Sequence, residues 1–197
     1  ADKMIHAYVP LVETTHGIRF ENTTGHLWFE EILSGDREEK MDAVRRHVNK
    51  GITYTLAMLE GGKGLHGERL EAVQDDNLRS LLAECLLQQK KYARIMDERY
   101  ARFAEGSTGP GSAIDKRFDE VFRSFLEKAG QVEEGLHTVI ERKWRNFWLM
   151  ESGIALLVVL FSLLAVLVIR SFFLERERSR RSLARSEENL RITFDSI

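Results

Sequence analysis

Residues 153–169, GIALLVVLFSLLAVLVI, contain no charged side chain and decide the fold of the C-terminal part of this chain. After Arg170 the apolar stretch continues with Phe172, Phe173 and Leu174. A helix that crosses a bilayer needs about 20 predominantly apolar residues, because every backbone amide must be hydrogen-bonded within the helix. A helix in the core of a soluble protein normally keeps a polar face. The run therefore predicts a transmembrane helix, which we place at residues 150–174.

The flanks of this run predict its orientation. Residues 170–185 contain six arginines against two glutamates, and Trp144 and Trp148 precede the run in the manner of an interfacial aromatic belt. Basic flanks are usually cytoplasmic. The difference in positive charge between the two flanks is reduced by Arg142, Lys143 and Arg145 on the other side of the run. We expect the inner (cytoplasmic) membrane, with residues 1–149 periplasmic and the C-terminus in the cytoplasm.

Composition narrows the function of the chain. The 197 residues carry 29 basic and 31 acidic side chains, so there is no basic surface for nucleic acid. The single cysteine, Cys85, excludes a disulfide within the chain and a cysteine-rich zinc site. Because the chain starts at Ala1 without a signal peptide and stops inside an unfinished pattern, we expect a piece of a longer protein with a further spanning helix before Ala1.

Three groups of turn-forming residues, at 34–36, 61–67 and 106–112, divide the first 149 residues. The segments between them, 1–33, 37–60, 67–105 and 113–149, repeat apolar residues at threes and fours and show no alternation typical of strands. Pro10 is expected to bend the first helix without ending it. These patterns predict an all-α fold. It is an up-down-up-down four-helix bundle ectodomain that continues into the transmembrane helix and a cytoplasmic signalling helix at 175–188.

The apolar positions of each segment give the expected core. In the first segment they are Ile5, Val9, Val12, Phe20, Leu27 and Leu33; in the second, Met41, Val44, Val48, Ile52 and Leu59. In the third they are Leu78, Leu82, Cys85, Tyr92, Met96 and Phe103; in the fourth, Phe118, Val121, Phe125, Val132, Leu136 and Val139.

The first segment has the least usual heptad pattern. One row spaced by seven is Val9, His16, Thr23 and Glu30, and the other is Ile5, Val12, Arg19, His26 and Leu33. Polar groups at a helix seam are costly unless they are paired, so these rows suggest a binding site. The candidate ligand-binding residues are His16, Arg19, Thr23, His26 and Glu30. They would form a pocket or dimer-interface site for a small anion, which Arg99, Arg102 and Arg117 could approach.

Other interpretations of these rows stay open. The helix could drift in phase, so that Phe20, Leu27 and Ile32 enter the core. The polar residues could instead form a buried network that fixes the helix register. His26 and Glu30, one turn apart, and two Glu-x-x-His pairs, Glu13 with His16 and Glu134 with His137, offer metal-ligand spacings, although two further bridging glutamates are not evident. We predict no metal and no cofactor, and histidine pH sensing is a further alternative.

No catalytic constellation occurs in the sequence. The glycines at 61–64 follow no expected strand, and there is no Gly-x-Ser-x-Gly motif. This fragment is therefore not expected to be an enzyme itself.

The C-terminal residues 183–197, LARSEENLRITFDSI, resemble the beginning of a PAS domain, with a Ser-Glu-Glu stretch and a later Phe-x-x-Ile pattern. Leu183, Leu190 and Ile197 are spaced by seven, a pattern typical of coiled-coil pairing. We place the start of a truncated PAS domain at residues 189–197. The whole arrangement resembles a bacterial transmembrane sensor receptor of the PAS-linked histidine kinase type, and residues 1–149 resemble the bundles of chemoreceptors and nitrate-sensing kinases in architecture alone.

The resemblance implies a homodimeric receptor that detects a periplasmic small-molecule or anionic ligand and transmits the signal by helix movement. Its expected partners are a second copy of the chain, membrane lipid and, through the missing output domain, a response regulator. The alternatives are a diguanylate cyclase sensor, a chemoreceptor, or a structural dimerisation spacer coupled to a partner membrane protein. The absence of proline from residues 170–197 departs from the HAMP domain usual in chemoreceptors.

Overall fold

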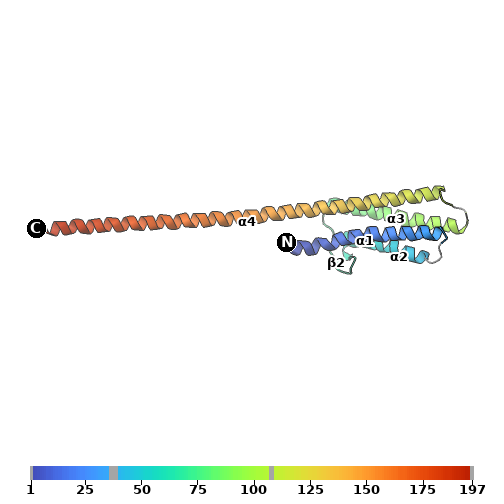
Figure 1. Cartoon of the computed structure of the whole chain (residues 1–197), viewed down its shortest axis with the longest axis horizontal. Helices are drawn as coiled ribbons and strands as arrows, with labels where there is room; N and C mark the ends of the chain where they lie inside the picture. Colours follow the sequence, from blue (N-terminus) through green and yellow to red (C-terminus); the bar gives the residue numbers. More distant parts are fainter. Residues whose placement is uncertain (1, 36–39, 107–108, 196–197) are drawn as a thin grey trace. The chain divides into compact units, whose positions relative to one another are not determined.

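Helices make up almost all of this chain, as a computed structural model shows. It describes the backbone of residues 2–35, 40–106 and 109–195, and the side chains of residues 8–35, 40–106, 109–173 and Arg176. The helices are α1 (Asp2–Leu33), α2 (Met41–Glu60), α3 (Asp76–Ala104) and α4 (Ala113–Asp195) (Figure 1). The all-α prediction is therefore confirmed. Pro10 lies inside α1 and does not end it.

The chain divides into two units, residues 1–142 and 143–197. In the first unit α1 packs on α2 and α2 on α3. The first part of α4 joins them through side chains, such as Lys128, whose Nζ lies 2.7 Å from an oxygen of Glu84 on α3.

The connection between α2 and α3 corrects two expectations. Strands β1 (Gly62–Lys63) and β2 (Arg69–Leu70) form a small antiparallel hairpin that the sequence patterns did not predict. Gly67 turns this hairpin at a φ of 84°, a conformation that glycine adopts without strain. Helix α3 consequently begins at Asp76, well after residue 67. The Asp75 side chain caps this helix by accepting a hydrogen bond of 3.1 Å from the Leu78 N–H.

The core of the first unit follows the spacing predicted for α2, α3 and α4, except that Phe103 near the end of α3, which was expected in the core, is 38% exposed. Buried residues recur at threes and fours, as expected for helices that each present one apolar stripe. They include Val44 and Val48 of α2; Leu78, Leu82, Cys85, Tyr92 and Met96 of α3; and Phe118, Phe125, Val132 and Leu136 of α4.

The buried face of α1 differs from the prediction. Phe20 is 65% exposed, Leu27 56% and Val9 46%, so the proposed drift of Phe20 and Leu27 into the core is wrong. The buried residues lie on a different face of α1 from the two predicted heptad rows and are Leu11, Thr14, Thr15, Gly17, Ile18, Glu21, Asn22, Gly25 and Phe29. The reason is that α1 carries apolar residues on every side, and its core-facing stripe includes polar residues and glycine where close packing needs them. A Cβ on Gly25 would lie 3.0 Å from a methyl group of Val48 on α2.

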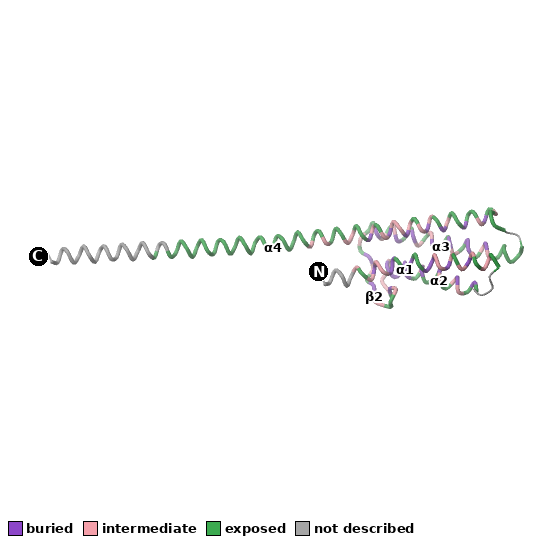
Figure 2. Tube along the Cα trace, viewed as in Figure 1, coloured by how far each residue is buried: buried purple, intermediate pink, exposed green. Residues whose placement is uncertain are grey.

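The second unit is helical from Lys143 to Asp195. Every residue of its apolar run, 153–169, is exposed, which Figure 2 shows as continuous green tube. This helix is long and apolar enough to cross a membrane by length and composition. The heptad of Leu183, Leu190 and Ile197 and the side chains of the PAS-like segment lie outside the described residues.

Candidate functional site

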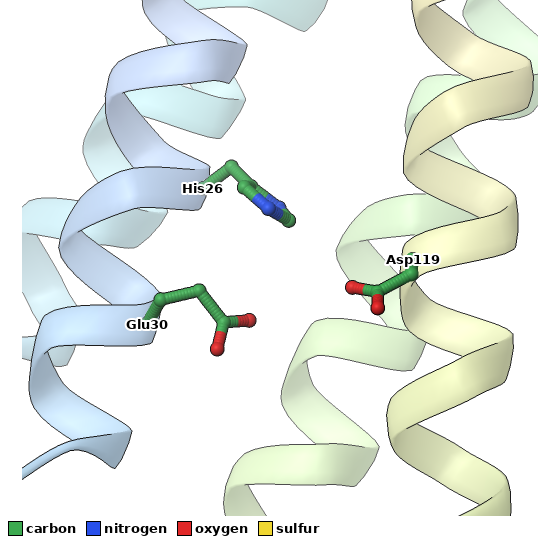
Figure 3. A group of neighbouring side chains, drawn as sticks. All are labelled: His26, Glu30 and Asp119. Carbon is green, nitrogen blue, oxygen red and sulfur yellow. The ribbon is translucent and has the colours of Figure 1, made fainter. Parts of the chain in front are cut away.

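A polar cluster lies inside the first unit, where α1 faces α4. His26 and Glu30 are one turn apart on α1, and Asp119 comes from the facing side of α4 (Figure 3). One potential ligand atom from each side chain lies within 4.8 Å of the other two. The three side chains therefore converge on one small volume between two helices.

His26 is held in place by aromatic rings. Its imidazole stacks on Phe122 at 3.8 Å between centroids with an interplanar angle of 5°, and on Phe118 at 5.1 Å. Burial lowers the pKa of His26, an effect that the carboxylates of Glu30 and Asp119 oppose and the Arg99 guanidinium reinforces. The ring is therefore neutral at neutral pH. Its Nδ1 atom is buried and has no hydrogen-bond partner among the described residues.

Arg99 of α3 neutralises part of the charge in the cluster. Its side chain is 8% exposed and forms ion pairs with Glu30 and with Asp115 of α4. The guanidinium also lies over the rings of Phe118 at 4.8 Å and Phe29 at 5.5 Å. The cluster therefore has the three carboxylates of Glu30, Asp115 and Asp119 against the one guanidinium of Arg99, which is an excess of two negative charges.

Tyr92 of α3 adds a second unsatisfied polar atom. The residue is fully buried, and its hydroxyl has no hydrogen-bond partner among the described residues. Its ring centroid is 6.2 Å from that of His26. Burial and the Glu30 carboxylate raise the pKa of this hydroxyl, whereas Arg99 lowers it. The hydroxyl is thus within electrostatic range of the cluster.

The other predicted site residues lie elsewhere on α1. His16 and Arg19 are exposed and both contact Glu133 of α4, at 3.3 Å and 2.7 Å. Burial raises the pKa of Glu133, but the hydrogen bonds from Arg19 and His16 outweigh it and leave the pKa below its usual value. Thr23 is half-buried. Of the five candidates, the structure brings only His26 and Glu30 into the cluster.

The arginines expected to approach the site are also separated. Arg99 reaches Glu30, but Arg102 pairs with Glu98 on its own helix and Arg117 is exposed. The two Glu-x-x-His pairs do not converge either: His16 contacts Glu133, while Glu134 and His137 are exposed.

A second buried polar group was missed by the sequence patterns. The Glu21 carboxylate is 4% exposed and lies 2.5 Å from both His47 Nδ1 and Lys50 Nζ of α2. Nearby, Thr55 donates a hydrogen bond of 2.7 Å to Gln89, and the Asn22 amide packs on Gly51. Asn22 Oδ1 and Gln89 Nε2 have no hydrogen-bond partner among the described residues, whereas the Glu21 contacts and the Thr55–Gln89 bond fit the alternative interpretation of a network that fixes helix register.

Asp119, Asp115 and Tyr92 were also missed as members of the cluster. The one indication in the sequence is that Asp115 and Asp119 are one turn apart and flank Phe118 on a helix whose apolar row was recognised. Comparison with protein-family models, with curated proteins and with solved structures found no match for this chain.

Proposed function

We propose that this chain is the sensing and transmembrane portion of a signal-transduction receptor. The observation that supports it is the composition of α4. This one helix contributes core residues such as Phe118 and Phe125 to the first unit, and further along the chain it carries the exposed apolar run. A helix that belongs to both a folded domain and a membrane span is suited to transmit a change of packing.

In this proposal the first unit is an up-down-up-down four-helix bundle in the periplasm. The contacts of α1 with α2 and of α2 with α3, and the ion pairs of α4 with α1 and α3, agree with such a bundle. The connections at 34–40 and 105–112 are short, which favours antiparallel neighbours, while the connection at 61–75 carries the hairpin of β1 and β2. The basic flank after the apolar run supports a cytoplasmic C-terminus.

The receptor would act as a homodimer. Val9, Phe20 and Leu27 expose large apolar side chains on α1, whereas the other exposed large apolar residues described in the first unit are Leu87 and Phe103 on α3. Exposed apolar patches on soluble surfaces commonly mark interaction sites. This proposal expects a second copy of α1 as the partner at this surface. The resemblance implies an output domain beyond residue 197, made of a PAS domain and a histidine kinase.

The bound signal would be a small molecule or ion that favours one packing of the helices over another. The polar cluster of His26, Glu30, Arg99 and Asp119 offers such a site because it joins α1, α3 and α4 through charges. The spacer alternative is supported by the apolar patch on α1, but it gives no role to buried polar atoms that lack partners.

Thermal unfolding of the full chain in detergent, with a panel of small anions, carboxylates and divalent cations, tests the proposal. A ligand at 100 times its dissociation constant stabilises a protein by about 2.7 kcal/mol. We expect one class of ligand to raise the unfolding temperature, and Glu30→Gln to remove the effect. If Arg19→Glu removes it instead, the site lies at the Glu133 pair. No shift across the panel would favour the spacer.

A further inference from the structure

The donor set of the polar cluster is chemically specific. It combines one imidazole nitrogen of His26 with carboxylate oxygens of Glu30 and Asp119, all within 4.8 Å of one another. Mixed nitrogen and oxygen sets suit divalent transition metals such as Zn²⁺, whereas Mg²⁺ and Ca²⁺ prefer oxygen alone. Metal–ligand bonds of about 2.0–2.2 Å would require these atoms to move slightly closer, and the exposed Asp119 side chain is free to do so.

The environment of His26 also suits metal binding. The stacking on Phe122 at 3.8 Å fixes the ring plane, so binding costs little side-chain entropy. The Nδ1 atom is buried without a partner among the described residues, a state that is costly unless something occupies it.

Two further observations point to a cation. The three carboxylates of Glu30, Asp115 and Asp119 exceed the single Arg99 guanidinium by two charges, which is the charge of one divalent ion. The fully buried Tyr92 hydroxyl, which also lacks a partner among the described residues, lies within electrostatic range of Glu30 and could accept a hydrogen bond from a metal-bound water. An anion would find the cations here already paired.

We propose that His26, Glu30 and Asp119 bind one divalent transition-metal ion between α1 and α4. Glu30 contacts Arg99 through both of its carboxylate oxygens, so ligation of the metal competes with that ion pair. Arg99 keeps Asp115 as a partner when Glu30 turns to the metal. The ion would thus exchange a contact between α1 and α3 for one between α1 and α4. This coupling rests on the proposed sensor function, whereas the binding itself does not.

The test is Zn²⁺ binding to the full chain, purified in detergent and stripped with EDTA, in competition with a chromophoric chelator. We expect one saturable Zn²⁺ per chain, undiminished by millimolar Mg²⁺. Asp119→Asn, at an exposed position that leaves the fold intact, should weaken binding by at least about tenfold, because even outer hydrogen-bond partners of a metal site contribute about 10- to 100-fold. His26→Phe, which preserves the aromatic stack, should weaken it likewise.

Two matched controls exclude binding by surface side chains. Glu120→Gln removes the exposed carboxylate next to Asp119, and His66→Ala removes an exposed histidine 3.9 Å from Glu13. Both should bind like the unmodified chain. Absence of saturable binding, or equal losses in Asp119→Asn and Glu120→Gln, would overturn the proposal. The binding assay measures no signalling output, so its result does not depend on the receptor function, and a separate failure of that function would leave the metal site standing.

Discussion

Replacing Arg99 by methionine should destabilise the first unit by about 3 kcal/mol. Removing one partner of a buried ion pair typically costs about 3–5 kcal/mol, because a charge remains buried without compensation. Arg99 is 8% exposed, but Glu30 is 38% exposed and Asp115 still accepts a hydrogen bond of 2.6 Å from the Gly111 N–H. Both carboxylates therefore keep other partners or water, which places the expected loss at the lower end of that range.

Cys85 provides an assay that reports on the first unit alone. It is the single cysteine of the chain, it is 1% exposed, and burial raises the pKa of its thiol to about 12. A thiol reagent consequently labels it only when the core opens. A loss of 3 kcal/mol should increase the labelling rate of the full chain in detergent by about 150-fold, since about 1.4 kcal/mol corresponds to a factor of ten.

The control is Arg45→Met on α2. Arg45 is 43% exposed and pairs with Asp97, which is 53% exposed, so its loss should cost less than about 1 kcal/mol. If Arg99→Met labels no faster than Arg45→Met, the ion pairs of Arg99 do not stabilise the packing of α1, α3 and α4, and our account of the cluster fails.

Three other changes test separate parts of the structure. Gly51→Ala should destabilise by about 1–3 kcal/mol, as overpacking does, because the new Cβ would lie 2.0 Å from the buried Asn22 amide; an unchanged urea midpoint would contradict this packing. The lowered pKa of Glu133 means that its contribution to stability is complete above about pH 4.5 and is lost as the pH falls through its folded pKa. Arg19→Gln should therefore flatten the fall in the unfolding midpoint between about pH 6 and 3, and an unaltered profile would remove Arg19 from that interaction. Leu27→Lys, at a position 56% exposed, should convert dimers to monomers in light scattering without changing the helical content, and a persistent dimer would move the interface away from α1.

The sequence predicted the core best in helices where the apolar residues that recur at threes and fours are also the buried ones. In α3 the row Leu78, Leu82, Cys85 and Tyr92 is buried as expected, because the opposite face of that helix is charged. In α1 the same reasoning failed. Phe20 and Leu27 are apolar and exposed, whereas Thr15 and Asn22 are polar and buried, and no periodicity distinguishes a partner surface from a core.

The candidate site shows the same limit. The spacing of His26 and Glu30 is local to one helix, so the sequence could indicate it. Asp119 joins them only through the packing of α4 on α1, and the pairing of Arg99 with Glu30 links residues far apart in the chain. The prediction of an anionic ligand rested on arginines whose carboxylate partners, Asp115 and Glu133, depend on that packing.

The central claim is that residues 153–169 cross a bilayer, with the first unit on one side and the C-terminal end on the other. It is tested most directly in vesicles, with a full chain that carries Ser34→Cys and Ser182→Cys in a Cys85→Ala background. A membrane-impermeant maleimide should label each molecule at one of the two cysteines, whichever orientation it took on insertion, and label both only after detergent is added. Molecules labelled at both positions before detergent would show that the chain does not span the membrane.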